Sequence, residues 1–140
     1  MRKVLIDTDP GVDDAVALAL AFCLPDLEVV GLTSVGGNAS IDDTTRNLAA
    51  LLTALSQERV PFARGAAEQL NGASFEHAYH IHRDGGLGIA LPAPLLSTID
   101  LPASDFILKA ATEHREALTI IALGPLTNLA TALRRDQHVL

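Results

Sequence analysis

The regular alternation of short apolar runs with longer helical segments constrains the fold more than any other feature of this sequence. Four apolar runs, each with the length of a strand buried on both faces of a sheet, occupy residues 4–6, 27–35, 60–64 and 118–123. Four longer segments with the composition or apolar spacing of helices occupy residues 12–23, 40–56, 104–114 and 126–135. Strands that alternate with helices predict an α/β fold with an open, mainly parallel sheet flanked by helices.

The composition favours one folded α/β domain over residues 1–140 and argues against several classes of partner. Apolar residues make up 49% of the chain, enough for a substantial core. Asp and Glu outnumber Lys and Arg by 17 to 10, which disfavours nucleic acid and anionic membranes as partners. The apolar run 15–24 is too short to span a bilayer and no secretory leader is evident, so a cytoplasmic location is expected. Cys23 is the single cysteine, which excludes an intrachain disulfide.

One long segment, residues 71–102, shows no clear periodicity. It contains four glycines, three prolines and three histidines. Loops of this length inside a compact domain are usually functional or disordered, and we expect this one to bring one or two histidines over a substrate. A zinc site formed by His77, His80 and His82 is an alternative for which no fourth ligand is evident. Taken singly, His77 and His80 are also explained as ordinary surface residues.

Four carboxylates follow the first predicted strand within eight residues: Asp7, Asp9, Asp13 and Asp14. Ligands of open α/β sheets bind at the carboxyl ends of the strands, so the cluster lies where a site is expected. Like charges this close repel each other, and a hard, oxygen-preferring cation such as Ca²⁺ or Mg²⁺ would offset the repulsion. The alternative is a solvated acidic loop in which Asp13 and Asp14 begin a helix, but this leaves Asp7 and Asp9 unexplained.

Two further loops follow predicted strands at the same end of the sheet. Residues 35–38 (Val-Gly-Gly-Asn) end the second strand, and Asn38 can both donate and accept hydrogen bonds. Residues 123–128 (Leu-Gly-Pro-Leu-Thr-Asn) follow the fourth strand, where the carbonyl of Leu123 would point into the same crevice and suits Ca²⁺. Taken alone, each loop is explained at least as well by a simple turn into a helix.

Together these motifs resemble the fingerprint of the inosine-uridine nucleoside hydrolase family. The sequence Asp-Thr-Asp-Pro-Gly-Val-Asp-Asp at residues 7–14 carries the resemblance, and the loops at 35–38 and 123–128 strengthen it by their order and distance. The resemblance implies a Rossmann-like fold and hydrolysis of the N-glycosidic bond of purine or pyrimidine ribonucleosides to base and ribose, with a Ca²⁺-activated water. It covers the whole chain but less than half of a typical member, so the chain looks like the N-terminal part of such a domain.

The resemblance also implies which residues would hold the metal. Asp9 and Asp14 would ligate one Ca²⁺, together with the backbone carbonyl of Leu123. Asp9 would in addition be the general base, and Asp7 would support the loop through hydrogen bonds. This arrangement suits the reaction, because carboxylates stabilise an oxocarbenium-like sugar and a bound cation lowers the pKa of its water.

Substrate contacts follow from the resemblance in the same way. Asp13 and Asn38 would hold ribose hydroxyls, and His82 would lie near the nucleobase. The loop around His82 departs from the family's His-Gly-x-Asp-Gly-Leu-Gly pattern, because Arg83 stands in place of the usual glycine and Gly85 in place of the usual acid.

The family's second half has no counterpart in this sequence, which leaves other functions open. The missing half carries a further Asp metal ligand, further ribose contacts and a histidine that assists the leaving base. A non-catalytic remnant that binds only Ca²⁺ or ribose is therefore the alternative function. A phosphatase of the haloacid dehalogenase type, with Asp7 as nucleophile, fits less well because residues 10–12 differ from its motif. The low aromatic content gives no support to a protein-binding module.

A sheet that is only half of its family's would expose an apolar edge or face. Exposed edges and large apolar patches promote association. We therefore expect a homo-oligomer, or low stability, in addition to a ribonucleoside as the small-molecule partner.

Overall fold

The computed structural model describes residues 1–92, 94 and 96–138, and its centre is a sheet of parallel strands. The strands are β1 (Arg2–Thr8), β2 (Leu27–Ser34), β3 (Phe62–Ala63) and β4 (Leu118–Ala122). They lie side by side in the order β3-β2-β1-β4, so that β1 has a neighbour on each side. The predicted α/β fold and the predicted order of strands and helices along the chain are confirmed.

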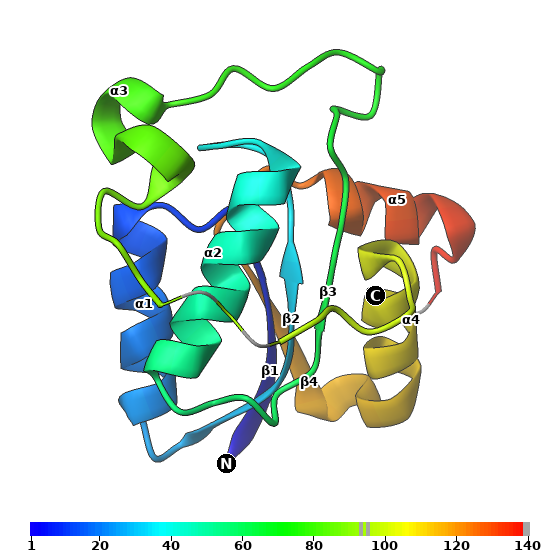
Figure 1. Ribbon diagram of the computed structural model, residues 1–140. Helices are drawn as coiled ribbons and strands as arrows, with labels where there is room; N and C mark the ends of the chain where they lie inside the picture. Colours follow the sequence, from blue (N-terminus) through cyan, green and yellow to red (C-terminus); the bar gives the residue numbers. More distant parts are fainter. Residues whose placement is uncertain (93, 95, 139–140) are drawn as a thin grey trace.

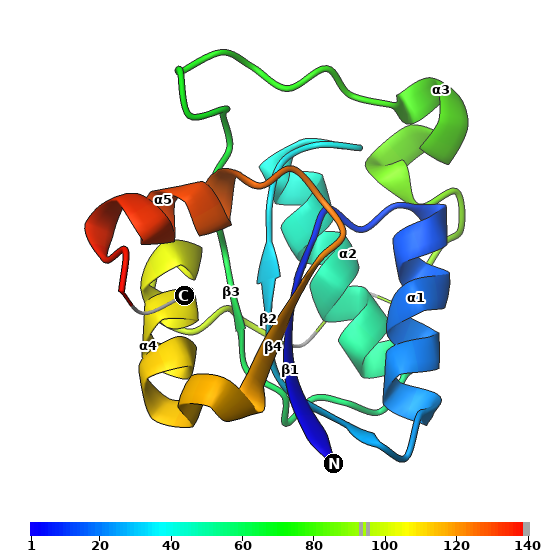
Figure 2. The ribbon, with the colours of Figure 1, turned by 180° about the vertical axis from the view of Figure 1, so that it is seen from behind.

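Helices cover both faces of this sheet. α1 (Val12–Cys23) and α2 (Ile41–Ala54) pack on one face, and α4 (Ala103–His114) and α5 (Thr127–Arg135) on the other (Figures 1 and 2). A 3-10 turn, η2 (Arg115–Ala117), leads from α4 into β4. Among the described helices, none is long and apolar enough to span a membrane.

The central strand joins the two cores. Successive side chains of a strand point to opposite faces: Val4 and Ile6 pack beneath α1 and α2, whereas Leu5 packs beneath α4 and α5. Each of the three is at most 2% exposed, and complete burial of such a side chain stabilises the fold by about 1.5–3 kcal/mol. The strand that carries Asp7 and leads to Asp9 is therefore firmly anchored.

α2 begins and packs as its sequence predicts. Ser40 is the N-cap, and its hydroxyl accepts a hydrogen bond from the Asp43 N–H at 3.2 Å. Leu48, Leu51 and Leu52, three of the four leucines predicted to share one face, are buried in the core under this helix.

The segment 71–102 departs in part from its prediction as a stretch without regular structure. It contains the single-turn helix α3 (Tyr79–His82) and the 3-10 turn η1 (Asp84–Gly86). One helical turn has too few residues to show a 3.6-residue period, so the pattern could not predict it. The third strand is also shorter than predicted. Residues 93 and 95 of the segment, like 139–140, lie outside the described residues.

The carboxyl ends of β1, β2 and β4 meet at one edge of the sheet, as predicted. Asp7 on β1 lies beside Thr33 on β2 and Ala122 on β4. Because the strands are parallel, the loops that follow them leave at the same end, and α3 lies at that end too (Figure 1). The candidate residues of three separate motifs are thereby brought within reach of one another.

Candidate functional site

Asp9 lies in the loop after β1 and is held by the turn after β2. The N–H of Asn38 donates to Asp9 Oδ2 at 2.7 Å, and the side-chain amide of Asn38 donates to the Asp9 carbonyl at 3.2 Å. Asp9 is 4% exposed, so protein groups rather than bulk water surround its carboxylate. The structure thus brings together Asp9 and Asn38, which the sequence places in different motifs.

Asp14, in the first turn of α1, shares the Asn38 amide with Asp9. Thr8 Oγ1 donates to Asp14 Oδ1 at 2.6 Å, while the Gly11 N–H and Asn38 Nδ2 donate to Oδ2 at 3.2 and 3.3 Å. A carboxylate at this helix position caps the backbone and is favoured by the helix dipole. Asp14 therefore stabilises the start of the helix, which is the role that the solvated-loop alternative gave it. It also belongs to the acidic cluster.

Two glycines form the walls around Asp9. A Cβ added at Gly37 would overlap Asp9 Oδ2, and one added at Gly124 would lie 2.8 Å from Asp9 Oδ1. Both positions therefore need glycine because the backbone approaches the carboxylate closely. This explains the glycines of both loops more completely than a simple turn does.

Asp7 is buried beneath the cluster and holds neighbouring elements. Its Oδ1 accepts hydrogen bonds from Thr33 Oγ1 at 2.5 Å and from Asn128 Nδ2 at 2.8 Å. Its Oδ2 is buried and has no hydrogen-bond partner within the described part of the chain. The hydrogen bonds of the Asp7 side chain thus run to β2 and α5 rather than to the loop that follows β1.

Asn128 is the residue of this site to which sequence reasoning gave no role. Besides Asp7, its amide reaches the Ser34 carbonyl at 2.9 Å, and its Oδ1 accepts from the Ala66 N–H at 2.9 Å. The side chain is nearly fully buried and connects α5, β2 and the segment after β3. The sequence held one signal for this role: Asn128 stands near the start of the helix that directly follows the fourth predicted strand.

Burial raises the pKa of all three buried carboxyl groups. Desolvation raises the pKa of Asp7 to about 6, against the opposing hydrogen bonds from Thr33 and Asn128. Desolvation also raises the pKa of Asp9 to about 6, with a further upward contribution from the nearby Asp14 and Asp13 charges. The pKa of Asp14 is raised mainly by burial, which the Thr8 hydrogen bond offsets in part. Their negative charge is therefore under-compensated, which favours a cation.

His82 lies against the start of α1 and is buried. Its Nδ1 accepts a hydrogen bond from the Val12 N–H at 3.2 Å, and the ring packs against Gly11. An imidazole that accepts at Nδ1 carries its proton on Nε2. Asp13 Oδ1 lies 3.9 Å from Nδ1, with its side chain 81% exposed. Asp13 and His82 are thus neighbours, and the Asp13 carboxylate is open to a ligand.

The other two histidines do not converge with His82. The ring of His77 contacts the Gly37 carbonyl through Nδ1 at 2.9 Å, whereas His80 is exposed. Tyr79 attaches the same segment to α2, because its hydroxyl donates to Asp43 Oδ2 at 2.8 Å and accepts from the Ser40 N–H at 3.0 Å. Through His77 the segment with α3 contacts the turn after β2, and through His82 it contacts the end of the loop after β1.

The donors around Asp9 fit a hard cation in kind, and supply part of a coordination shell. Asp9 and Asp14 offer anionic oxygens, the ligands that Ca²⁺ prefers, but Ca²⁺ takes six to eight oxygens. Leu123 is the predicted carbonyl ligand. Its N–H donates to the Asp7 carbonyl at 2.8 Å, and the next residue, Gly124, lies against the Asp9 carboxylate. Across residues 1–92, 94 and 96–138, no three His, Cys, Asp or Glu side chains lie close enough to hold a metal by themselves.

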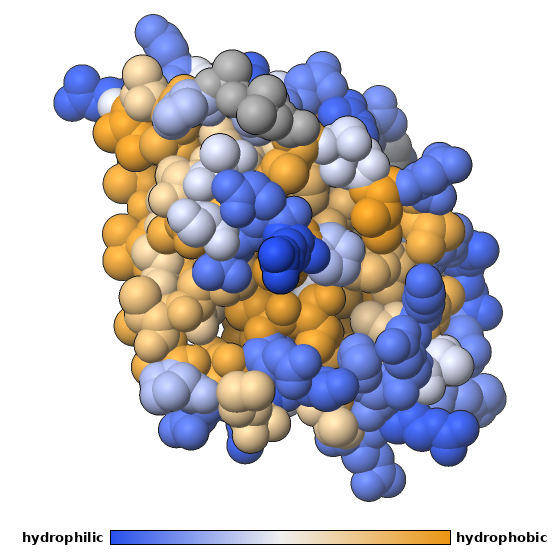
Figure 3. Space-filling model, turned by 60° about the horizontal axis from the view of Figure 1, so that its bottom comes forward, coloured by the Kyte–Doolittle hydropathy of each residue, from blue (hydrophilic) through white to orange (hydrophobic). Residues whose placement is uncertain are grey.

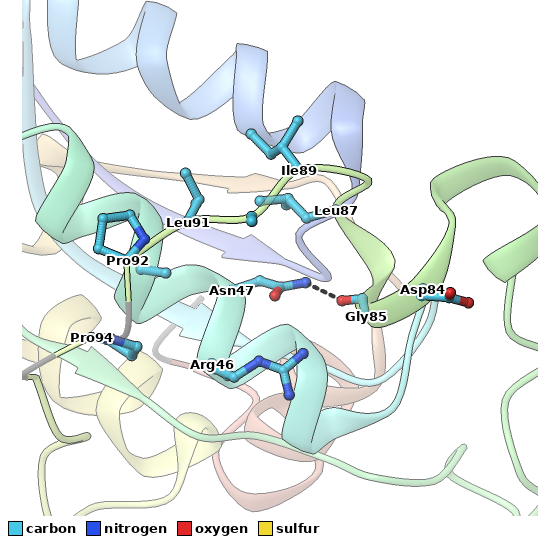
Figure 4. A pocket seen from close by; sticks show the side chains of 11 residues that line it. Arg46, Asn47, Asp84, Gly85, Leu87, Ile89, Leu91, Pro92 and Pro94 are labelled. Carbon is cyan, nitrogen blue, oxygen red and sulfur yellow. Dashed lines mark hydrogen bonds between the residues drawn. The ribbon is translucent and has the colours of Figure 1, made fainter.

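A pocket with a volume of about 240 Å³ lies beside this cluster, between α2 and residues 84–94 (Figure 4). Asn47 lines it and donates to the Gly85 carbonyl at 2.7 Å, and more weakly to the Pro10 carbonyl at 3.4 Å. Leu87, Ile89 and Leu91 give the pocket an apolar wall. Asn47 thus connects the loop after β1 to the segment that carries His82, but the acidic cluster is not part of this pocket.

Comparison with known proteins identifies relatives of the chain. Residues 4–140 match the family model described as inosine-uridine preferring nucleoside hydrolase. Uridine nucleosidase 1 of Arabidopsis thaliana is 44% identical over 136 residues, which are 96% of this chain and 40% of the relative. The pyrimidine-specific ribonucleoside hydrolase RihA of Escherichia coli is 38% identical over 131 residues, which are 93% of this chain and 42% of the relative.

Solved structures give the same result. A plant nucleoside hydrolase superimposes with a TM-score of 0.94 at 38% identity, over 99% of this chain and 44% of that one. A purine-preferring ribonucleoside hydrolase from Gardnerella vaginalis superimposes with a TM-score of 0.94 at 30% identity, over 99% of this chain and 45% of that one. The chain thus spans less than half the length of the relatives that it matches, and it corresponds to the N-terminal part of a typical one.

Proposed function

Since the chain belongs to the inosine-uridine preferring nucleoside hydrolase family, we propose that its acidic cluster binds the ribose of a ribonucleoside for hydrolysis of the N-glycosidic bond to base and ribose. The observation that carries this proposal is the convergence of Asp9, Asp14 and Asn38 at one edge of the sheet. Relatives are named for uridine, pyrimidine and purine nucleosides, so both base classes are candidate substrates.

Asp9 is the proposed general base. Its Oδ2 is held by Asn38 and its Oδ1 lies beside Gly124, which fixes the carboxylate for proton transfer at one position. Burial raises the pKa of this carboxyl to about 6 in the metal-free chain, and a bound cation would lower it and keep the carboxylate ionised as a base. The proton of the attacking water would pass to Asp9, while the other carboxylates of the cluster stabilise the oxocarbenium-like sugar as the bond to the base breaks.

Asp9, Asp14 and the carbonyl of Leu123 are the proposed ligands of one Ca²⁺. When bound, Ca²⁺ would orient hydroxyl groups of the ribose and lower the pKa of the attacking water. Asn38 and the exposed Asp13 are the proposed contacts of the ribose hydroxyls. His82, held at the start of α1 with its proton on Nε2, is the proposed donor toward the nucleobase.

The alternative function is binding without turnover. The chain spans about 40% of the length of uridine nucleosidase 1 from Arabidopsis thaliana, and the cluster supplies only part of a cation's oxygen ligands. A chain that binds Ca²⁺ or ribose but lacks the leaving-group acid would retain the cluster and release no base.

Ribose release and Ca²⁺ binding separate these two functions. The purified chain is assayed with inosine and with uridine, with Ca²⁺ and with EDTA, and Ca²⁺ binding is followed by titration calorimetry. Turnover that requires Ca²⁺ and is lost in Asp9→Asn is the expected result for the hydrolase. For the non-catalytic remnant, the expected result is Ca²⁺ binding without turnover. Asp9→Asn and Asp14→Asn should then each weaken Ca²⁺ binding about tenfold or more.

Asp26→Asn is the matched control, because Asp26 is an exposed residue in the turn after α1. This variant should bind Ca²⁺ and turn over as the unaltered chain does. If the unaltered chain shows neither turnover nor Ca²⁺ binding, the hydrolase and the Ca²⁺-binding remnant are both wrong for this chain, and titration with ribose tests the remnant that binds ribose alone.

A further inference from the structure

The segment before α3 follows the turn after β2 closely. The ring of Phe75 packs on Gly36, where an added Cβ would lie 2.9 Å from Phe75 Cδ2. The N–H of Ala78 donates to the Asn38 carbonyl at 2.9 Å. Figure 1 and Figure 2 both show the cyan turn after β2 extending toward α3, at the end of the molecule away from the face that Figure 3 brings forward. The turn that holds Asp9 is therefore itself held from its outer side.

His77 adds a side-chain hydrogen bond to this contact. Its Nδ1 lies 2.9 Å from the Gly37 carbonyl oxygen. A carbonyl oxygen can only accept a hydrogen bond, so Nδ1 carries the proton that is donated to it. His82 has the opposite arrangement, because its Nδ1 accepts from the Val12 N–H and its proton lies on Nε2. The two histidines are thus expected to be opposite tautomers.

The Gly37–Asn38 peptide group connects the His77 hydrogen bond to Asp9. Its carbonyl accepts from His77, and its N–H donates to Asp9 Oδ2 at 2.7 Å. Because a peptide group is planar and trans, its C=O and N–H point in opposite directions, so a donor that fixes the carbonyl also fixes the N–H. Hydrogen bonds in such a chain polarise one another, which strengthens the bond to the carboxylate.

Glycine at position 37 makes an external restraint of this kind necessary. A Cβ there would overlap Asp9 Oδ2, so the turn must use glycine, and glycine restricts the backbone least. The residue that lets the main chain approach Asp9 therefore does little to fix the orientation of the peptide group that follows it. The hydrogen bond from His77 supplies that orientation.

We propose that His77 is a positioning residue of the acidic cluster: it donates from Nδ1 to the Gly37 carbonyl and thereby holds the Asn38 N–H on Asp9 Oδ2. The inference rests on the proposed function, since Asp9 is the proposed cation ligand and base. In this role His77 acts through the peptide group and needs no contact with the substrate. Its ring also packs edge-on to Tyr79 at 5.5 Å between centroids, so the test must separate ring packing from hydrogen bonding.

Nuclear magnetic resonance of the isotopically labelled, metal-free chain tests the proposal without turnover. At about pH 8, where an ordinary imidazole is neutral, the ring-nitrogen shifts should place the proton of His77 on Nδ1 and that of His82 on Nε2. His77→Phe keeps a ring beside Tyr79 but removes the donor. Amide exchange at Asn38 should then become about fivefold faster, the equivalent of one hydrogen bond, and its proton resonance should move upfield. His77→Asn places an amide donor where Nδ1 lay and should restore both values.

His80→Phe is the matched control, since it makes the same exchange at an exposed position of α3. It should leave the resonance and the exchange rate of the Asn38 amide unchanged. Circular dichroism of each variant checks that the fold is retained. A His77 proton on Nε2, an Asn38 amide unaffected by His77→Phe, or a His77→Asn variant that behaves like His77→Phe would each overturn the proposal.

Ca²⁺ titration of the same variants distinguishes this inference from the proposed function. His77→Phe should weaken Ca²⁺ binding about fivefold, and His77→Asn should restore it. Equal Ca²⁺ affinity in the unaltered chain and in His77→Phe would overturn the positioning role. A chain that shows the expected tautomers and the expected change at Asn38, but binds no Ca²⁺, would contradict the proposed cation site and support the action of His77 on Asp9.

Discussion

At the scale of the residue, the three buried carboxyl groups differ in what surrounds them. Asp9 and Asp14 share the amide of Asn38, whereas Asp7 is bonded through one oxygen only and leaves Oδ2 buried without a partner in the described residues. A buried carboxylate without full compensation is costly. Asp7 therefore makes a sensitive probe of how the site depends on pH.

We expect the metal-free chain to lose stability as the pH rises from 4 to 7. The pKa of Asp7 is about 6 in the folded chain, against an ordinary value of 3.8, so the folded state binds more protons than the unfolded state in this interval. The free energy of unfolding therefore decreases as the pH rises. At 1.36 kcal/mol per pKa unit, the decrease due to Asp7 is about 3 kcal/mol. Urea unfolding in EDTA at several pH values measures it.

Asp7→Asn is the test variant for this pH dependence. It keeps an acceptor for Thr33 and Asn128 but removes the titration, so its free energy of unfolding should fall less steeply over the same interval. Asp43, whose pKa is lowered by Tyr79 and Arg46 despite its burial, contributes with the opposite sign and only below about pH 4. A slope unchanged by Asp7→Asn would contradict the assignment.

Asn128→Ala should destabilise the fold strongly. It removes a buried amide that bonds Asp7, the Ser34 carbonyl and the Ala66 N–H. Leaving such groups unsatisfied costs about 1–3 kcal/mol each, so we expect a loss of at least about 2 kcal/mol in urea unfolding. Thr131→Ala, one turn further along α5, removes a hydroxyl that bonds only its own helix at Thr127 and should cost much less.

At the scale of the element, the start of α2 connects the helix to the segment that carries His82. Ser40 caps the helix, and Asp43 accepts from Ser40 and from the Tyr79 hydroxyl. Arg46 pairs with the same carboxylate at 2.6 Å. A single helix terminus therefore positions α3 over the loops that hold Asp9.

Tyr79→Phe should loosen α3 without altering the core. The variant keeps the ring, which stacks edge-on to His77 at 5.5 Å between centroids, and removes both hydrogen bonds of the hydroxyl. Amide hydrogen exchange in residues 79–83 should become faster, with a loss of about 1 kcal/mol in stability. Unchanged exchange there, with Ser40→Ala as a comparison for the cap alone, would show that the hydroxyl does not position α3.

The order of elements could be predicted because each core strand or helix carries its own pattern. The apolar run 4–6 predicts a buried strand, and the leucines of α2 predict its inner face. Contacts that depend on distant parts of the chain could not be predicted in this way. Asn128 is 121 residues from Asp7 in sequence, and the bond of His82 to Val12 depends on where a long segment returns.

At the scale of the whole molecule, the acidic cluster lies at the carboxyl end of β1, the strand that has a neighbour on each side in the described sheet. The chain has a formal charge of −7, and Asp9 and Asp14, two of its carboxylates, lie close together in a low-dielectric environment. Any cation that binds the folded chain and not the unfolded chain must stabilise the whole fold by mass action.

Ca²⁺ should therefore raise the melting temperature more at pH 7.5 than at pH 5. At pH 5 the carboxyl of Asp9, with a pKa of about 6, is mostly protonated and binds the cation poorly. At 100 times the dissociation constant, the stabilisation is about 2.7 kcal/mol. Calorimetric melting measures it, with a monovalent salt of equal ionic strength as control and Asp9→Asn as the variant that should show a clearly smaller increase.

The glycine walls around Asp9 have an evolutionary consequence. Because Gly37 and Gly124 bring main chain against the carboxylate, a side chain at either position would displace it. Exposed positions on the covering segment, such as His80, carry no such constraint. Mutational tolerance should therefore divide sharply, low at the two glycines beside Asp9 and high at exposed positions of the covering segment.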